Sequence, residues 1–369
     1  MRKNSRKKDN TIEKRMTAGC ILLAVSAAMT VWAGKSPDMA EWYSAHIYPV
    51  IVSTLGRFSG MFPWSLSELC FYTLIVLLIG TLIHAGVSAF RSKQGGAVML
   101  KWASGLFLTA SVLLFLYVMN CGINYKSDSF SEQAGLYTSE YTADDLKQVC
   151  IRLTDEVNAR ADRVNRDGSG VMQLDGPEGD EAVEAMKQLG TYYPELAGYY
   201  PPPKKLLLSQ ILSYQGLTGI YLPFTVEANY NKDMTPYNIP FTACHELSHL
   251  RGFMQEEEAN FIAFLACKDA GRVDFQYSGY LSGWVYSMNA LHRADAEAWE
   301  EVRSLLGGNV EADLKANNQF WAKYDGTVAE VSNKVNDTYL KANGQSDGVQ
   351  SYGRMVDLIV AYYCKISNL

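Results

Sequence analysis

Two histidines and a glutamate occur at a spacing that can bind and use a metal ion. Residues 241–249 read Phe-Thr-Ala-Cys-His-Glu-Leu-Ser-His, which contains the pattern H-E-x-x-H. Residues four apart lie above one another on a helix, so His245 and His249 can direct both imidazoles to one zinc ion. Glu246 lies about 100° further round the helix, beside the metal, where its carboxylate can accept a proton from water. This arrangement is typical of zinc-dependent peptide hydrolysis.

A third protein ligand is expected, because a catalytic zinc usually has three and keeps one position open. Gly252 predicts the end of the first helix, since glycine readily adopts the left-handed conformation, and a second helix should begin soon after it. A carboxylate in the first turn of that second helix would face back to the histidines. We expect Glu256 to be the third ligand, with Glu257 and Glu258 as alternatives. Asn260, on the same helix face as Glu256, is expected to orient a histidine.

A hydrolase of this kind also needs a donor for the oxyanion of the tetrahedral intermediate. Tyr352 and Arg354 flank a glycine near the expected start of the last helix, so we expect these two to complete the catalytic set. Further candidates after the motif are Tyr280, Tyr286 and His292.

Chance occurrence of H-E-x-x-H is the alternative, with His245 and His249 as ordinary helix residues and the glutamates as a solvated face. Two observations count against it. The chain has only five histidines, two of which lie here, and apolar residues flank the motif on both sides, which predicts a buried helix. Cys244 should point away from the histidine face, and we expect it to be a buried free thiol.

Composition and hydropathy indicate a membrane protein. The chain has 369 residues, a net charge of −6 and no basic stripe, so nucleic-acid binding is not expected. Three segments lack Asp, Glu, Lys and Arg for about the 20 residues that cross a bilayer, and the second contains one histidine, His84. They are Met16–Gly34, Leu69–Phe90 and Trp102–Tyr125, and together they define a membrane region over 16–125.

Lysines and arginines predict the orientation of these spans. Residues 1–15 carry seven of them, residues 35–68 carry two, and residues 91–101 carry three. The positive-inside rule therefore predicts a cytoplasmic basic tail at 1–15 and a domain outside the cytoplasmic membrane at 126–369.

The external domain should be α+β and mainly helical with a small sheet. The best strand is Gly219–Asn231, and its proline favours an edge position. The expected helices cover about 240–251, 255–270, 278–305, 310–343 and 351–367.

The metal-binding pattern resembles the glutamate-zincins, in which a glutamate follows H-E-x-x-H and an aspartate often stands four residues later. Here Asn260 stands where that aspartate would be. The spacing from His245 to Gly252 also resembles the metzincins, although Gln255 replaces their third histidine.

Nearly the whole chain resembles a bacterial membrane protein family known as domain of unknown function 3810. That resemblance implies a membrane-anchored, zincin-like domain and names no substrate. The stretches that carry it are Asn124–Leu136, Thr235–Cys267, Tyr277–Leu291 and Val335–Val356.

These observations predict a multi-pass membrane protein that is a zinc metallopeptidase. Its cofactor would be Zn²⁺, its substrate a peptide or protein of the cell envelope, and its surroundings the lipid bilayer. One alternative is a non-catalytic sensor or scaffold with a zincin-like domain, which a fourth protein ligand to zinc would favour. A protease acting within the membrane is less consistent with the sequence, because the motif lies far beyond the last span among charged residues.

Overall fold

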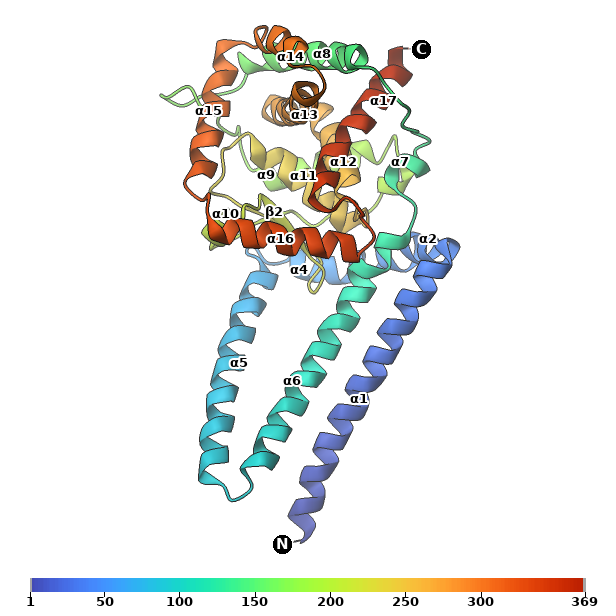
Figure 1. Cartoon of the computed structure of the whole chain (residues 1–369), viewed down its shortest axis with the longest axis vertical. Coiled ribbons are helices and arrows are strands. Elements are labelled where there is room, and N and C mark those ends of the chain that lie inside the picture. Colours follow the sequence, from blue (N-terminus) through green and yellow to red (C-terminus); the bar gives the residue numbers. More distant parts are fainter. Residues whose placement is uncertain (1, 368–369) are drawn as a thin grey trace. The chain divides into compact units, whose positions relative to one another are not determined.

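The structure, a computed structural model, describes residues 2–367 and is mainly helical (Figure 1). It divides into two compact units. Unit 1 consists of Met1–Tyr48, Leu66–Ser127 and Pro223–Thr225, and unit 2 of Pro49–Ser65, Asp128–Leu222 and Val226–Leu369.

Unit 1 contains the three apolar helices α1 (Arg2–Lys35), α5 (Leu66–Arg91) and α6 (Gly95–Tyr117), with α6 packed against the other two. Segments long and apolar enough to cross a membrane cover Asn10–Lys35, Leu66–Arg91 and Gly95–Lys126. The three spans predicted from hydropathy are thus helices of suitable length and composition. The predicted basic tail is continuous with the first of them, because α1 already begins at Arg2. Unit 1 also contains the short helix α2 (Pro37–His46).

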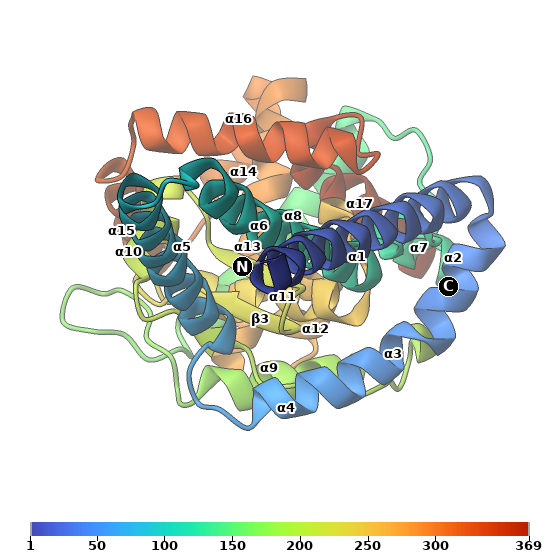
Figure 2. The ribbon, with the colours of Figure 1, turned by 90° about the horizontal axis from the view of Figure 1, so that it is seen from below.

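Unit 2 contains most of the remaining helices and the sheet (Figures 1 and 2). The α-helices that lie wholly within it are α4 (Arg57–Gly60), α7 (Phe130–Gln133), α8 (Ala143–Ala161), α9 (Glu178–Leu189), α10 (Ser209–Gln215), α11 (Asn238–Arg251), α12 (Glu256–Lys268), α13 (Val273–Ala294), α14 (Ala296–Arg303), α15 (Gly308–Ala322), α16 (Thr327–Ala342) and α17 (Met355–Ser367). A π-helical turn at Val52–Gly56 and a 3₁₀ segment at Gly348–Arg354 belong to it as well.

The sheet of unit 2 has three short strands in the order β1–β3–β2. The central strand β3 (Glu227–Tyr230) pairs in parallel with β1 (Lys204–Lys205) and antiparallel with β2 (Gly219–Leu222). The single strand predicted over 219–231 is therefore a hairpin, because the chain turns at 223–226, where Val226 has a φ of 54°. Its proline lies in this turn, and β2 forms one edge of the sheet.

Helix α11 lies at the centre of unit 2, where α9, α12, α13 and the hairpin strands pack around it. Every residue from Ile239 to Leu250 is buried. The helix ends where Gly252 adopts a φ of 116°, a left-handed conformation that costs little only for glycine. The helix start and stop predicted around the motif agree with these bounds.

Two long helices expected from the sequence are interrupted. The helix predicted over 278–305 is α13 followed by α14, because the extended Asp295 caps the second helix by accepting a hydrogen bond from the Ala298 amide. The helix predicted over 310–343 is α15 and α16, which are separated by a turn ending at Gly326. Apolar periodicity continued across both breaks, so it did not reveal them.

Residues 49–65 belong to unit 2, although they precede the second membrane span in the sequence. Gly56 and Gly60 lie against Pro201, where an added Cβ would come within 3.6 and 3.2 Å of the proline ring. The Arg57 guanidinium lies 4.2 Å from the centre of the Tyr199 ring. This segment is therefore packed as part of the globular unit.

Candidate metal centre

Helix α11 brings His245 and His249 together on one face, as their four-residue spacing predicts. Their ring centres are 4.6 Å apart and the rings are nearly perpendicular. Both residues are 8% exposed and are therefore buried, and His245 also lines a cavity.

Glu256 is the carboxylate that meets both histidines. The turn at Gly252 reverses the chain, and Glu256 is the first residue of α12, the position from which a side chain can face α11. Its Oε2 atom lies 3.2 Å from Nε2 of His245 and 3.5 Å from Nε2 of His249. These three residues form a group whose ligand atoms all lie within 4.8 Å of one another.

The two neighbouring glutamates have other partners. Glu257 accepts a hydrogen bond of 2.7 Å from the Gln345 amide. Glu258 accepts hydrogen bonds from the backbone N–H and the hydroxyl of Ser131, at 3.0 and 2.6 Å. The geometry therefore favours Glu256 among the three candidates left open by the sequence.

The cluster has the dimensions and donor chemistry that zinc requires. Tetrahedral zinc with bonds of about 2.0–2.1 Å separates its ligand atoms by about 3.3 Å, close to the two distances measured from Glu256. Nδ1 of His249 donates a 2.8 Å hydrogen bond to the Phe253 carbonyl oxygen, which leaves the Nε2 lone pair of the neutral ring directed to the cluster. Within the described part of the chain, Oε2 of Glu256 is buried without a hydrogen-bond donor. A bound cation would satisfy that oxygen, so these residues fit a zinc ion.

The protonation states of His245, His249 and Glu256 depend on one another. Burial opposes ionisation of Glu256, but the adjacent His249 and His245 hold the pKa of its carboxyl well below the usual range. Burial likewise opposes protonation of His249, yet the charge of Glu256 raises the pKa of that imidazole to about 9. The pKa of His245 is lowered by burial, which contacts with Glu256 and Asn260 offset only in part. A carboxylate held ionised beside two imidazoles suits a cation-binding site.

The side chain of Glu246 extends from α11 toward the edge strand β2. Burial raises the pKa of its carboxyl to about 8, and the charge of Glu256 contributes to this rise. A hydrogen bond from the backbone of Tyr221 in β2 holds the carboxylate. At Gly219, also in β2, an added Cβ would lie only 2.4 Å from Oε1 of Glu246. Only a residue without a side chain leaves room for the carboxylate there.

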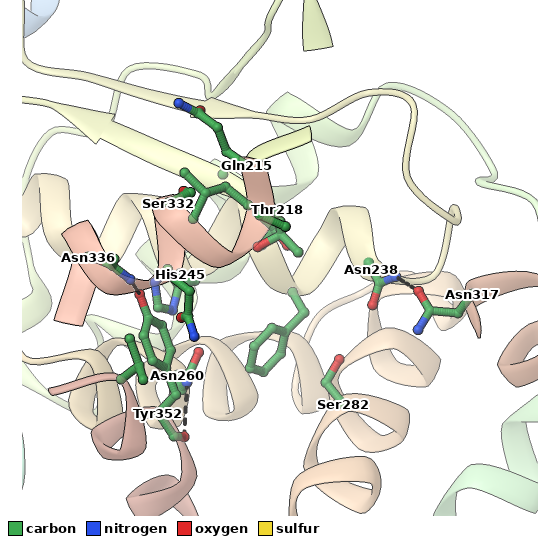
Figure 3. A pocket seen from close by; sticks show the side chains of 18 of the residues that line it. Gln215, Thr218, Asn238, His245, Asn260, Ser282, Asn317, Ser332, Asn336 and Tyr352 are labelled. Carbon is green, nitrogen blue, oxygen red and sulfur yellow. Dashed lines mark hydrogen bonds between the residues drawn. The ribbon is translucent and has the colours of Figure 1, made fainter. Parts of the chain in front are cut away.

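A cavity of about 700 Å³ opens beside this cluster, and its walls include His245, Glu246, Asn260 and Tyr352 (Figure 3). Many of the lining side chains are uncharged hydrogen-bonding groups. They include Gln215, Thr218, Asn238, Ser282, Asn317, Ser332, Asn333 and Asn336. Such a lining can satisfy the N–H and C=O groups of a bound polar chain.

Asn260 and Tyr352 lie together at the cavity wall (Figure 3). The Asn260 amide donates to the backbone carbonyl of Tyr352 at 3.3 Å, and the Asn336 amide donates to the Tyr352 hydroxyl at 3.4 Å. Burial raises the pKa of the Tyr352 phenol well above its usual range, as does the charge of Glu256, so the hydroxyl stays protonated and can donate a hydrogen bond. Nδ1 of the neighbouring His245 has no hydrogen-bond partner among the described residues.

The remaining sequence candidates have different positions. Tyr286 lines the cavity, and burial raises its pKa to about 12. Arg354 is exposed, pairs with Asp347 and does not line the cavity. His292 packs against Trp299, and Tyr280 packs against Phe264, and neither lines the cavity. The structure thus brings Tyr352 and Tyr286 to the cluster and leaves the other three apart from it.

Cys244 is buried, as expected, and is a free thiol. Its sulfur lies 3.6 Å from the sulfur of Cys267 in α12, on the side of α11 that packs against that helix. It does not belong to the group formed by the histidines and Glu256.

Sequence reasoning missed several features of this site. Asn336 comes from α16, which is remote in the sequence, and nothing in its local pattern marked it. The Phe253 carbonyl is a backbone group, which a search of side chains cannot find. Gly219 could have been noticed as a glycine opening a predicted strand, since glycine there often marks the close approach of another group.

Comparison with known proteins gives a family but no activity. No curated protein matches the chain, and no solved structure matches it. The sequence model of one family matches residues 43–360, which is most of the chain and includes the whole histidine–glutamate cluster. The chain therefore belongs to the family described as "Protein of unknown function (DUF3810)".

Proposed function

We propose that this protein is a membrane-anchored zinc metallopeptidase that hydrolyses peptide bonds in the cavity of unit 2. The observation that carries the proposal is the cluster of His245, His249 and Glu256, of which His245 lines the cavity together with the adjacent Glu246. In this proposal the first three residues hold zinc. Zinc in such sites supplies Lewis-acid polarisation of a carbonyl and lowers the pKa of water.

Glu246 would act first as general base and then as general acid. Its carboxylate takes a proton from the attacking water, whose oxygen forms a bond to the scissile carbonyl carbon. The same proton then passes to the leaving nitrogen as the C–N bond breaks. Burial raises the pKa of this carboxyl to about 8, which favours the protonated form that the second step requires.

Tyr352 would stabilise the developing oxyanion. Its hydroxyl accepts a hydrogen bond from Asn336 and keeps its own proton available for donation into the cavity. Loss of one such donor typically costs about 10²–10³ in turnover. The proposal gives no role in the reaction to Arg354, which pairs with Asp347 outside the cavity.

A peptide substrate is supported by the surroundings of the cluster. The edge strand β2 lies next to Glu246 and can pair with an extended chain, and the amide-rich lining offers further hydrogen bonds. The rival hypothesis of a structural zinc site requires a fourth protein ligand. Glu257 and Glu258 are both bonded elsewhere, which counts against that rival.

The decisive experiment measures both metal content and peptide cleavage in the full-length protein purified in detergent. Elemental mass spectrometry should find about one zinc per chain in the wild type and none in His245→Ala. A peptide library analysed by mass spectrometry should be cleaved by the wild type and left intact by Glu246→Gln, which should retain zinc. Turnover retained in Glu246→Gln would refute the assigned mechanism, and absence of zinc from folded wild-type protein would refute the metal site.

The proposal also assigns unit 2 to the outside of the cytoplasmic membrane, on the basis of the lysine and arginine distribution. Added protease should therefore digest unit 2 in intact cells from which any outer barrier has been removed. Protection of unit 2 in that experiment would overturn the proposed sidedness without touching the proposed chemistry.

A further inference from the structure

Large apolar side chains remain exposed on three segments of unit 2, and we call the surface they form the apolar face. Among the described residues of unit 2, the other exposed large apolar side chains are Tyr137, Tyr192 and Leu305, which are isolated in the sequence. The apolar face consists of Val50, Phe58, Met61 and Trp64, of Leu207, Leu208, Ile211 and Tyr214, and of Val328, Val331, Val335 and Tyr339.

The three segments adjoin one another. Helix α10 packs against α16, and the Tyr214 ring lies edge-on to that of Tyr324, 5.0 Å away, in the turn before α16. Trp64 and Leu207 line the same surface hollow. Figure 1 shows α4, α10 and α16 at the same end of unit 2, and Figure 2, seen from below, shows α16 and α4 at opposite margins of that end with α10 at a third margin. The apolar side chains thus belong to one side of the unit.

Helix α16 carries an exposed apolar stripe beside the polar residues that line the cavity. Ser332, Asn333 and Asn336 line the cavity, whereas Val331 and Val335 are 54% and 64% exposed. With about 100° between successive residues, the valine stripe lies roughly a quarter-turn from the cavity side. A stripe of this kind requires an apolar partner outside the unit.

Chain connectivity indicates that the partner is the lipid bilayer. Trp64 lies two residues before Leu66, where the membrane-spanning helix α5 begins, so this part of the apolar face is tied to the end of a span. Tryptophan, tyrosine and phenylalanine are the side chains that favour the membrane–water interface.

We infer that the apolar face lies in the interfacial layer of the bilayer, and that the cavity beside it receives polypeptide held at the membrane surface. Residues 216–218, which follow α10, line the cavity together with residues of α16, and α10 and α16 both carry part of the apolar face. A chain entering between them is therefore at the level of the lipid headgroups. The substrate class is then the juxtamembrane stretch of a membrane-anchored protein, and this second statement rests on the proposed peptidase function.

A nitroxide probe tests the position of the apolar face without reference to activity. The full-length chain, with the exposed Cys20, Cys70 and Cys364 replaced by serine, is labelled at Val331→Cys or at the matched control Leu305→Cys and reconstituted in nanodiscs. At Val331→Cys the nitroxide should collide more often with oxygen, which dissolves in lipid, than with a water-soluble nickel chelate. At Leu305→Cys it should collide more often with the nickel chelate. Preference for the nickel chelate at Val331→Cys would overturn the inference. Protection from both reagents, as expected if a second copy or another protein covers the face, would overturn it as well.

A paired cleavage assay tests the substrate class. One peptide that the protein cleaves is presented free or anchored by an acyl chain to vesicles that contain the full-length protein. The anchored form should be cleaved at least about tenfold faster, since anchoring raises its effective concentration. Val331→Asp should remove this advantage while leaving cleavage of the free peptide unchanged, and Leu305→Asp should preserve the advantage.

The outcomes separate the two proposals. An unchanged advantage in Val331→Asp would refute the membrane-surface substrate and leave the peptidase proposal standing. Absence of cleavage of either peptide form by zinc-loaded wild type would refute the peptidase proposal and with it the substrate class, while the nitroxide result would still decide the position of the apolar face.

Discussion

Among the described residues, Glu256 is the one carboxylate that contacts both histidines, so its replacement by glutamine should weaken zinc binding sharply. Its Oε2 atom lies 3.2 and 3.5 Å from the two Nε2 atoms, whereas Glu257 is directed to Gln345. Glutamine keeps the volume of the side chain but carries no charge and offers a weaker oxygen donor. The effect should therefore appear in metal affinity and leave the packing of α12 intact.

The magnitude follows from the number of ligands. Zinc binding worth about 10–16 kcal/mol, shared among three protein ligands and one water, gives about 2.5–4 kcal/mol per ligand. Because each 1.4 kcal/mol is a factor of ten, Glu256→Gln should lose about two to three orders of magnitude in affinity. The neighbouring substitution Glu257→Gln changes the same kind of side chain one residue away and should leave affinity unchanged.

Competition with a chromophoric zinc chelator, on full-length protein at fixed pH and salt, measures both affinities. Circular dichroism of the same samples shows whether the helices are retained. Wild-type affinity in a folded Glu256→Gln variant would refute the ligand assignment. A loss in Glu257→Gln equal to that in Glu256→Gln would also refute it, because the site would then depend on the acidic run as a whole.

Three further outcomes are expected. Gly219→Ala should lower turnover about 100-fold without loss of zinc. The added Cβ would lie 2.4 Å from Oε1 of Glu246, so the carboxylate would have to shift by about 1 Å. Turnover equal to that of the wild type in a kinetic assay would contradict this prediction. Zinc affinity should rise about tenfold per pH unit up to about pH 9, because His249 must lose its proton before it can bind zinc. Burial opposes protonation of His249, but the charge of Glu256 raises its pKa to about 9. Zinc affinity that does not change between pH 6 and pH 8 would contradict this prediction. Asp313→Ala should destabilise unit 2 by about 3–5 kcal/mol, because the fully buried Asp313 carboxylate pairs with the largely buried guanidinium of Arg166. An unchanged midpoint of chemical denaturation would contradict this prediction.

Local sequence was sufficient for the features that depend on near neighbours in the chain. The four-residue spacing of the histidines, the glycine that ends α11 and the start of α12 all follow from helix geometry and backbone conformation. The three apolar spans depend on equally short-range properties. For this reason Glu256 could be named as the leading ligand before its distance to the histidines was known.

Tertiary structure decided the features that depend on contacts between remote segments. Glu257 and Glu258 are excluded from the cluster by Gln345 and Ser131, which lie far from them in the sequence. The hairpin at 219–230 places β2 against Glu246, and α16 closes the cavity with its polar side. Periodicity also failed to divide the two long helices, because the breaks depend on caps and turns that the apolar pattern crosses.

Side-chain chemistry and helical spacing were thus enough to predict which residues of this protein would bind and activate a metal ion. Only the tertiary structure decided which carboxylate meets the histidines, what lines the cavity and which face of α16 remains apolar and exposed. The physical reason is that burial, contact distance and charge coupling arise from packing between segments, and no short stretch of sequence contains both partners of such contacts.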